Sequence, residues 1–254
     1  MKVVLIGSGN VATVLAHKMI KGGHSIIQVF SRNTGNAQEL AAALNATFIN
    51  DITQLSQAGD IYILAVSDDV LPVLSKEIYL DTKLVVHTTG SASIHMLSSI
   101  SKNYGVLYPL QSLRKNKLEA AVPLLIDGSD ENILEIIQAF AQSLSPMVEY
   151  AGDEQRMKLH VAAVFVSNFV NHLYALSERY CDNEDLPFNV LYPLIEETAT
   201  RLKDYSPSDM QTGPAARGDE ATIAKHIEVL GAYPLLQKIY LELTESIIAF
   251  KGLN

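Results

Sequence analysis

The sequence predicts an α/β fold in which a mainly parallel, doubly wound sheet is followed by an all-helical second domain. In roughly the first 150 residues, short apolar runs alternate with helical patterns, which is typical of a parallel sheet covered by helices. After Gly152 no further strand pattern follows, and helical patterns continue toward the end of the chain. We therefore expect two domains, covering residues 1–151 and 152–254.

Eight strands and six helices are expected in the first domain. The strands fall at residues 2–6, 25–30, 46–49, 60–66, 83–87, 105–107, 123–126 and 146–149. The helices fall at residues 10–21, 37–44, 52–57, 70–78, 94–99 and 132–143. In the second domain, helices are expected at residues 153–180, 188–203, 220–230 and 235–250.

The first strand leads directly into a Gly-x-Gly-x-x-Ala turn at residues 7–12, and a helical pattern begins inside this turn. Such a turn suits a dinucleotide pyrophosphate, because glycine permits the tight bend and lets the backbone come close to the phosphates. The amide groups at the start of the helix would then face the phosphates. The pattern predicts a Rossmann-type nucleotide site, and an ordinary strand-to-helix turn is the alternative. The expected contacts are Gly7, Ser8, Gly9, Asn10 and Val11.

Residues after the second strand favour NADP over NAD as the cofactor. NAD-binding folds place an acidic side chain there to accept hydrogen bonds from the ribose, but this chain has Ser31 and Arg32. An arginine attracts the 2′-phosphate of NADP, whereas a carboxylate would repel it. A solvated loop charge is the alternative interpretation of Arg32.

The ends of the fourth and fifth strands should also border the cofactor, because ligands bind at the carboxyl ends of parallel strands. Val66, Ser67 and His87 are the candidates at these ends. A structural hydrogen bond is the alternative role for His87, because a histidine at the end of a buried strand often makes one.

The amino-acid composition of the chain argues against several classes of ligand and partner. The net charge is −9, which disfavours nucleic acid as a partner. The single cysteine, Cys181, excludes an internal disulfide and a cysteine-based zinc site, and no cluster of histidine and acidic residues has metal-ligand spacing. The apolar run at the start is too short for a signal peptide, and no stretch approaches the roughly 18 apolar residues that span a bilayer. We therefore expect no metal, no membrane partner and a cytoplasmic location.

The long helical pattern after the sheet carries polar residues among apolar ones. His160 and Ser167 fall near one face, and Asn168 lies further round the helix. Polar groups on so apolar a helix need partners, which a cleft beside the first domain would provide. His160 could supply the proton that accompanies hydride transfer, and Asn168 could orient the substrate. A structural polar cluster that ties helices together is the alternative.

Arg217 lies in a loop at residues 212–219 whose shape is fixed by two glycines and a proline. Its guanidinium could bind a carboxylate or phosphate through two parallel hydrogen bonds. A small-molecule substrate with an anionic group is the expected ligand, and an arginine that bridges helix ends or subunits is the alternative.

The chain resembles the two-domain NADP oxidoreductases of the coenzyme-F420-dependent type, which are related to pyrroline-5-carboxylate reductase and the 6-phosphogluconate dehydrogenase superfamily. Five segments carry the resemblance, at residues 7–12, 87–91, 108–112, 160–169 and 212–219. The resemblance implies a homodimer. We also expect Tyr108 and Gln111, which lie in one of these segments, to bind the substrate. Hydroxyacid dehydrogenases of the wider superfamily have a catalytic Lys-x-x-x-Asn on the helix after the sheet. Here Lys158 is followed four positions later by Ala162, so that pair is absent.

These observations predict an NADP-dependent oxidoreductase that moves a hydride between nicotinamide and a small carbonyl, imine or alcohol substrate in a cleft between the domains. The alternative is a sensor or scaffold protein that binds NADP without chemistry. Oxidation of bound NADPH by any member of a carbonyl and imine panel would distinguish the two.

Overall fold

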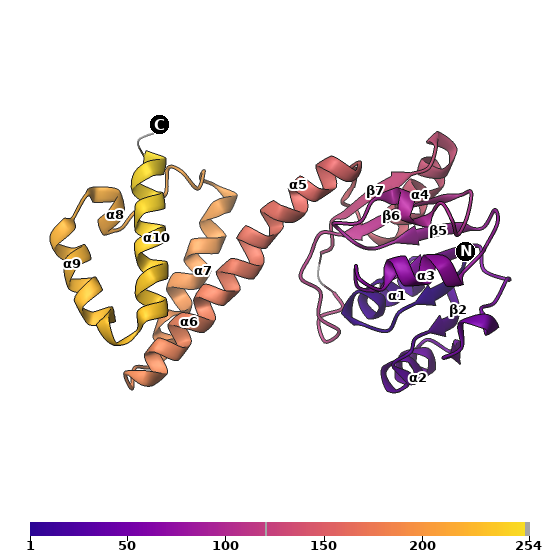
Figure 1. Cartoon of the computed structure of the whole chain (residues 1–254), viewed down its shortest axis with the longest axis horizontal. Helices are drawn as coiled ribbons and strands as arrows, with labels where there is room; N and C mark the ends of the chain where they lie inside the picture. Colours follow the sequence, from indigo (N-terminus) through magenta and orange to yellow (C-terminus); the bar gives the residue numbers. More distant parts are fainter. Residues whose placement is uncertain (120, 252–254) are drawn as a thin grey trace. The chain divides into compact units, whose positions relative to one another are not determined.

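The computed structural model describes residues 1–119 and 121–251, and the chain forms two compact units, Met1–Phe169 and Val170–Asn254 (Figure 1). The predicted boundary after residue 151 coincides with the end of the sheet, where a long helix begins. The division between the compact units falls further along this helix, so the first unit contains the whole sheet and the first half of the helix.

The first unit is built on an eight-stranded sheet with the strand order β3-β2-β1-β4-β5-β6-β7-β8. The strands are β1 (Lys2–Ile6), β2 (Ser25–Phe30), β3 (Thr47–Ile49), β4 (Ile61–Leu64), β5 (Leu84–His87), β6 (Tyr104–Pro109), β7 (Leu124–Gly128) and β8 (Val148–Tyr150). The first six strands are parallel, β7 is antiparallel to β6, and β8 is parallel to β7. This confirms the predicted doubly wound, mainly parallel sheet, with β1 and β4 at the point where the strand order reverses.

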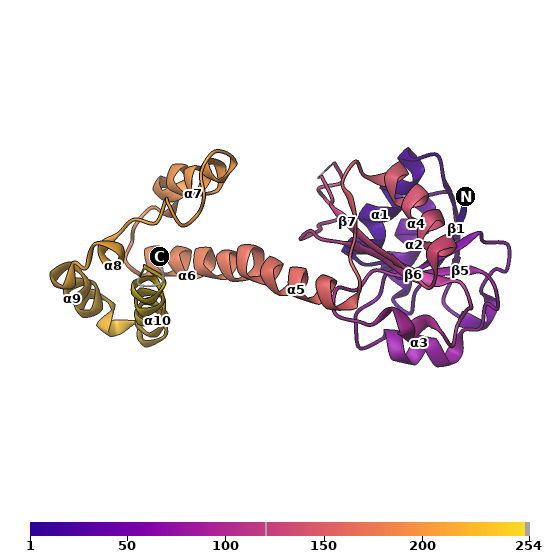
Figure 2. The same cartoon turned by 90° about the horizontal axis from the view of Figure 1, so that it is seen from above.

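Helices cover both faces of this sheet (Figure 2). On one face lie α1 (Asn10–Lys21), α2 (Thr34–Ala43) and α4 (Glu131–Leu144), and on the other lies α3 (Leu71–Glu77). Along β1, Val3 and Leu5 contribute to the first core, whereas Val4 and Ile6 contribute to the second. Successive side chains of a strand point to opposite faces, so a sheet covered on both sides needs the continuous apolar strands seen here.

Local capping explains three differences from the predicted helices of the first unit. Helix α2 begins three residues earlier than expected, because the side chain of Asn33 accepts a hydrogen bond from the amide of Asn36. The helices expected at residues 52–57 and 94–99 are short 3₁₀ turns, Ile52–Gln54 and Ile94–Leu97. Asp51 and Ser93 cap these turns, and such short turns are common as connectors.

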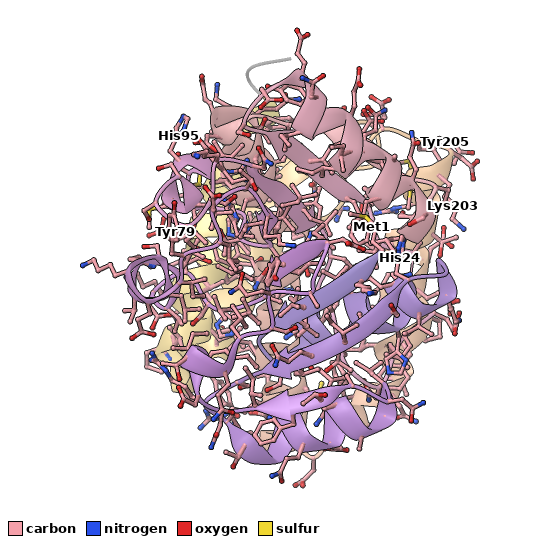
Figure 3. All side chains as sticks on the ribbon, turned by 90° about the vertical axis from the view of Figure 1, so that its right-hand side faces the viewer. Met1, His24, Tyr79, His95, Lys203 and Tyr205 are labelled. Atoms are coloured by element: carbon pink, nitrogen blue, oxygen red, sulfur yellow. The ribbon has the colours of Figure 1, made fainter. Side chains whose placement is uncertain are left out.

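His24 precedes β2 and lies at the amino ends of the strands. Its Nδ1 lies 3.0 Å from the amino group of Met1, and its Nε2 lies 2.7 Å from the hydroxyl of Ser143. Figure 3 shows Met1 and His24 next to each other. The carboxyl ends of the parallel strands, which lie at the opposite edge, remain available for a ligand.

One 31-residue helix, Asp153–Asn183, follows the sheet. It consists of α5 (Asp153–Ala163), a π-helical turn (Val164–Phe169) and α6 (Val170–Asn183). An 18-residue window has a mean hydropathy of 1.3, so this helix is long and apolar enough to cross a membrane by length and composition alone. The sequence-based expectation that no such stretch exists is therefore wrong. Valine and leucine residues keep the average high although histidine and asparagine side chains interrupt the run.

The second unit is helical. Its helices are α6, α7 (Tyr192–Thr200), α8 (Pro214–Arg217), α9 (Glu220–Val229) and α10 (Pro234–Lys251). The short helix α8 lies where the sequence predicted only a loop. It begins with Pro214, whose fixed φ suits a first helical turn, and it ends at Gly218, whose φ of 69° lies in the left-handed region.

Candidate functional site

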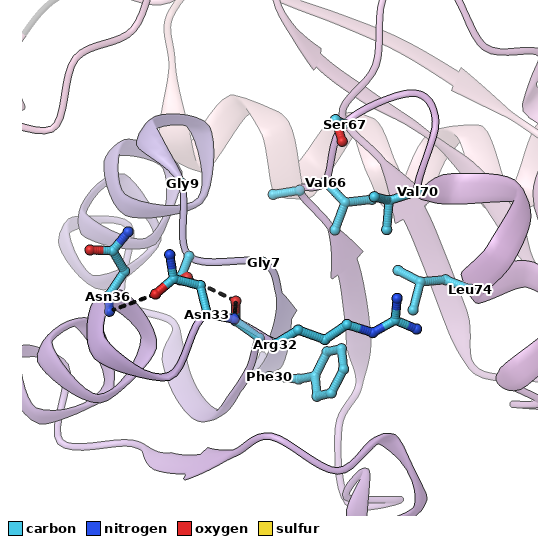
Figure 4. Close-up of a pocket in the computed structure, with 13 residues that line it drawn as sticks. Gly7, Gly9, Phe30, Arg32, Asn33, Asn36, Val66, Ser67, Val70 and Leu74 are labelled. Carbon is cyan, nitrogen blue, oxygen red and sulfur yellow. Dashed lines mark hydrogen bonds between the residues drawn. The ribbon is translucent and has the colours of Figure 1, made fainter.

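A pocket of about 330 Å³ opens at the carboxyl ends of the parallel strands in the first unit (Figure 4). It lies where β1, β2 and β4 end and where α1 begins. The lining residues are Gly7, Ser8, Gly9, Phe30, Ser31, Arg32, Asn33, Asn36, Ala65, Val66, Ser67, Val70 and Leu74. The loops that follow β1 and β2 contribute the polar groups of the lining. Phe30, Val66, Val70 and Leu74 form its apolar floor, and such a mixture is usual in small-ligand pockets.

The two glycines of the first turn have different structural roles. Gly7 has a φ of 121°, and a Cβ at this position would collide with the carbonyl group of Ala65 after β4. A Cβ on Gly9 would meet nothing within 4 Å, so the space beside its backbone is open. The turn therefore leaves room at the start of α1, where free backbone amides favour an anion. These residues fit the pyrophosphate of a dinucleotide.

Two side chains at the end of β2 would be next to the adenosine ribose of such a dinucleotide. The hydroxyl of Ser31 lies 3.0 Å from that of Ser8 and also accepts a hydrogen bond from the amide of Asn33. The guanidinium of Arg32 extends along the apolar floor beside Phe30 and Leu74 (Figure 4). It binds both carboxylate oxygens of Glu77, the last residue of α3, at 3.0 and 3.2 Å. Sequence reasoning missed Glu77, which is 45 positions away from Arg32 in the chain.

The structure brings together most of the residues predicted to contact the cofactor, and it places three elsewhere. Gly7, Ser8, Gly9, Ser31, Arg32, Val66 and Ser67 line this pocket. Asn10, Val11 and His87 are not among its lining residues. Asn10 instead accepts a hydrogen bond from the amide of Lys115 through its side chain, and Val11 packs against the core.

His87, expected beside the cofactor, is completely buried at the end of β5. Its Nδ1 accepts a hydrogen bond from the amide of Thr89, whereas its Nε2 has no partner. Burial lowers the pKa of His87 to about 4, and the positive charge of Arg156 contributes to the same shift. A neutral, buried imidazole of this kind favours the structural alternative that the sequence left open.

A second pocket of the first unit contains the residues predicted for chemistry. Its volume is about 490 Å³. The lining residues are Tyr108, Leu110, Gln111, Ser112, Leu159, His160, Ala162, Ala163, Val164, Val166, Ser167 and Asn168. The predicted substrate residues Tyr108 and Gln111 therefore share a pocket with the predicted catalytic residues His160 and Asn168. None of its lining residues carries a permanent charge.

Tyr108 and His160 form the most direct polar contact in this pocket. The hydroxyl of Tyr108, on β6, lies 2.8 Å from Nδ1 of His160, on α5, and the two rings meet edge to face. Burial raises the pKa of Tyr108, and the nearby carboxylate of Asp68 adds to this effect. The phenol therefore keeps its proton near neutral pH and can share it with the imidazole. Sequence reasoning selected both residues but not their pairing, because 52 positions separate them.

The loop after β5 packs tightly against this pair. A Cβ at Gly90 would lie only 2.8 Å from Nδ1 of His160 and 2.8 Å from Cζ of Tyr108. A hydrogen bond from Ser91 to Asp68 ties the same loop to the loop that follows β4. A residue without a side chain at position 90 thus allows the pair to approach the carboxyl edge of the sheet.

A π-helical turn explains why Asn168 joins the pocket. In a regular α-helix, Asn168 would lie well round the helix from His160, as the sequence analysis expected. The turn Val164–Phe169 is wider, so each residue rotates less about the axis, and both Ser167 and Asn168 reach the pocket lining. Turns of this kind are frequent at functional sites.

Arg156 anchors the start of α5 and was not selected from the sequence. Its side chain is 1% exposed and donates hydrogen bonds to the carbonyls of Ala92 and Ala151 and to the carboxylate of Asp153, the last at 2.6 Å. These bonds connect the helix that carries His160 to the loop that follows β5. A pattern search would pass over Arg156, because an arginine in a helix usually faces solvent.

Arg217 lies in the second unit, at the end of α8. Its side chain is 64% exposed and lies 3.9 Å from the carboxylate of Asp219, which caps α9. It lines a pocket of about 290 Å³ together with Ser208, Gln211, Thr212, Ala216, Ile247 and Phe250. Its predicted contact with an anionic substrate group stays a prediction.

Two family models match parts of this chain. Residues 2–90 match the family described as "NADP oxidoreductase coenzyme F420-dependent", and residues 122–247 match a domain of unknown function, DUF2520. A comparison with curated proteins gives no match.

Three solved proteins share the fold along nearly the whole chain. The "putative NADP oxidoreductase" from Bacteroides fragilis is 37% identical over 98% of each chain, with a TM-score of 0.91. A 1-pyrroline-5-carboxylate reductase from Streptococcus pyogenes is 12% identical over 98% of each chain, with a TM-score of 0.68. An imine reductase from Myxococcus stipitatus in complex with NADP+ is 16% identical, with 98% of this chain and 92% of that chain covered and a TM-score of 0.62. Its V8 variant, in complex with NAD+, gives 16% identity, coverage of 100% and 99%, and a TM-score of 0.61.

At 12–16% identity, the two reductases show a common fold. The Bacteroides fragilis protein is similar enough, over nearly all of both chains, to show the family as well. The chain therefore belongs to the family of NADP oxidoreductases of the coenzyme-F420-dependent type, in which a Rossmann-type domain precedes a helical C-terminal part.

Proposed function

We propose that the protein is an NADP-dependent oxidoreductase that interconverts a small carbonyl or imine compound and the corresponding alcohol or amine. The observation that carries this proposal is the Tyr108–His160 hydrogen bond, which lies in a pocket of the same unit as the dinucleotide pocket. Reduction of a C=O or C=N bond needs a hydride at carbon and a proton at oxygen or nitrogen. The chain offers a fitting site for a hydride-donating cofactor and a pair of groups that can hold the proton.

The residues of the first pocket would hold NADP. The amides at the start of α1 would bind the pyrophosphate, and the open space at Gly9 would allow the close approach. Arg32, with Ser31 beside it, would bind the 2′-phosphate, which favours NADP over NAD. When bound, the nicotinamide supplies the hydride, and the protein contributes binding, orientation and the proton.

In the second pocket, His160 would donate the proton to the oxygen or nitrogen of the substrate as the hydride reaches the adjacent carbon. Tyr108 holds the imidazole in place through its bond to Nδ1, so Nε2 is the ring nitrogen left to face a substrate. The side chain of Asn168, on the same pocket wall, would orient the polar group of the substrate. The hydrogen bond to Tyr108 fixes the orientation of His160, and general acid catalysis requires a proton donor that is held in position.

The pocket lining also supports a substrate class. Apolar groups from Leu110, Leu159 and Val164 alternate with neutral polar groups from Gln111 and Ser112. Such a surface suits a small, partly apolar molecule with one carbonyl or imine group. If the substrate also has an anionic group, Arg217 is the side chain that we propose for it.

The proposal is tested by measuring NADPH binding and then NADPH consumption with a panel of ketones, aldehydes and cyclic imines. We expect binding and, with at least one panel member, turnover that falls sharply in His160→Gln. The matched control is His17→Gln, because His17, on α1, lines a pocket that shares no residue with the pocket of Tyr108 and His160. Tight NADPH binding without turnover of any panel member would instead support a sensor or scaffold. Absence of NADPH binding would contradict both functions.

Two further expectations belong to this proposal. The protein would act in the cytoplasm, where NADPH is the common reductant. It would also form a homodimer, because the second unit leaves a large part of its apolar surface exposed.

A further inference from the structure

Arg32 is the one arginine among the described residues that line the proposed NADP pocket, and a carboxylate lies beside it. Glu77 closes α3, and both of its oxygens bind the same nitrogen of Arg32, Nη2, at 3.0 and 3.2 Å. The other guanidinium nitrogens of Arg32 make no bond to Glu77. Arg32, which lines the pocket, is 59% exposed and Glu77 is 38% exposed, so water reaches both groups.

This arrangement changes the electrostatics of the site. An arginine without an acidic neighbour would offer only positive charge to a 2′-phosphate, whereas Arg32 has the negative charge of Glu77 beside it. A phosphate that binds Nη1 and Nε would still meet the negative charge of Glu77 close by, and like charges in such positions repel. An unphosphorylated ribose would meet no such repulsion, and its hydroxyls can donate hydrogen bonds to a carboxylate.

We infer that Glu77 is a specificity-determining residue that weakens the preference of this site for a 2′-phosphorylated nucleotide. The inference rests on the proposed function, because it takes the pocket as a nucleotide site. It assigns to α3 the acidic group that the sequence lacks after β2.

The size of the effect follows from the exposure of the pair. Ion pairs between exposed side chains contribute little, because water screens both charges. Removal of the Glu77 charge should therefore improve binding of a 2′-phosphorylated nucleotide by a modest factor, roughly two- to fivefold. Added salt should reduce this gain, since the Debye length falls to about 3 Å at 1 M ionic strength.

The test is calorimetric titration of the full chain with adenosine 2′,5′-bisphosphate and adenosine 5′-monophosphate, which differ only in the 2′-phosphate. The ratio of their dissociation constants measures selectivity. We expect Glu77→Gln to raise the selectivity for the bisphosphate about two- to fivefold and Glu77→Asp, which keeps the charge, to raise it less. The matched control is Glu135→Gln, which removes an exposed carboxylate from α4 on the opposite face of the sheet.

A double-mutant cycle separates a contact with Arg32 from a general change in charge. In an Arg32→Ala background, Glu77→Gln should alter selectivity less than it does in the parent protein. The inference is overturned if both nucleotides bind the parent protein and the selectivity of Glu77→Gln equals that of the parent or of Glu135→Gln. It is also overturned, together with the proposed function, if neither nucleotide binds the parent protein.

Discussion

At the scale of single residues, the contact between Tyr108, His160 and Gly90 connects the sheet to the long helix. The tyrosine comes from β6, the histidine from α5, and the glycine from the loop after β5. Tyr108 and His160 must stay close because they share a hydrogen bond, and the loop after β5 must have a glycine at position 90 because both rings leave no room for a side chain there. A site held in this way keeps its proton donor in a fixed position without the help of a ligand.

The first prediction concerns this donor. His160→Gln should reduce turnover by a factor of roughly 10²–10⁴ and leave NADPH binding almost unchanged, because glutamine keeps a similar size but cannot donate a proton as an acid. Tyr108→Phe should reduce turnover less, because it removes the partner that orients the imidazole and keeps the imidazole itself. Steady-state kinetics with NADPH titrations on the same samples would show both effects. Parental turnover in His160→Gln would mean that His160 has a structural role.

The second prediction concerns His87 and pH. Its pKa in the folded protein is about 4, below the ordinary value of 6.5, so the unfolded chain binds the proton more readily between these two values. The free energy of unfolding should therefore rise with pH from about 4 to about 6.5, and His87 should contribute on the order of 3 kcal/mol to this change. Above pH 6.5 its contribution should be constant.

Urea unfolding at several pH values tests this account in the parent protein and in His87→Gln. We expect the variant to be less stable at pH 7 and to show a shallower dependence on pH between 4 and 6.5. Equal slopes for the two proteins would show that His87 is not the group that titrates on unfolding.

Sequence reasoning found the residues of both pockets more readily than the contacts between them. Gly7, Gly9 and Arg32 are recognisable because they follow strands whose carboxyl ends must lie together in a parallel sheet. The Arg32–Glu77 and Tyr108–His160 pairs join residues 45 and 52 positions apart. Which side chains meet at such separations depends on how α3 and α5 pack, and a single sequence does not contain this information.

At the scale of elements, the turn from β1 to α1 and the π-helical turn are the two irregular features that shape the pockets. The first was predictable, because its glycines mark a tight bend between a buried strand and a helix. The second was not, because its sequence Val-Phe-Val-Ser-Asn-Phe fits an ordinary helix equally well. The two 3₁₀ turns were predicted as longer helices and α8 was predicted as a loop, because a single capping residue or proline decides where such short elements begin and end. All eight strands were predicted.

The third prediction concerns the π-helical turn. Deletion of Phe165, which is 62% exposed, should convert the turn to a regular α-helix. Only six positions would then separate Ser167 from His160, which turns Ser167 about 120° round the helix from His160. We expect turnover to fall while NADPH affinity and the helix content seen by circular dichroism stay close to those of the parent. The matched control is Phe165→Ala, which removes the same side chain and keeps the turn. Equal turnover in the deletion and the control would show that the turn has no part in the site.

At the scale of the whole molecule, burial differs greatly between the two units. Both faces of the sheet in the first unit are covered by continuous cores. Among the described residues of the second unit, only Cys181, Ala215 and Leu230 are buried apolar residues. Exposed large apolar residues are spread over its helices, including Val190, Leu194, Leu202, Val229, Leu235 and Phe250. Soluble monomers rarely leave so much apolar surface uncovered.

The fourth prediction follows from this surface. We expect a homodimer whose interface is formed largely by the helical part, because a second copy would cover apolar area that a single chain leaves in water. Light scattering at micromolar concentration should give about twice the chain mass of 27.8 kDa. Leu194→Asp, at a position 65% exposed, should weaken the dimer, whereas Val73→Asp, 43% exposed on α3, should not. A monomer mass for the parent protein would contradict this prediction.

In the proposed reaction, hydride moves from NADPH to a carbonyl or imine carbon while the Tyr108–His160 pair supplies the proton. The most direct measurement uses NADPH that carries deuterium at nicotinamide C4, prepared in each stereoisomer, with mass spectrometry of the products of the ketone and imine panel. The account predicts that one stereoisomer places deuterium on the carbon that bears the new hydroxyl or amine, and that His160→Gln slows this transfer strongly. Binding of NADPH with no deuterium in any product, from either stereoisomer, would contradict it.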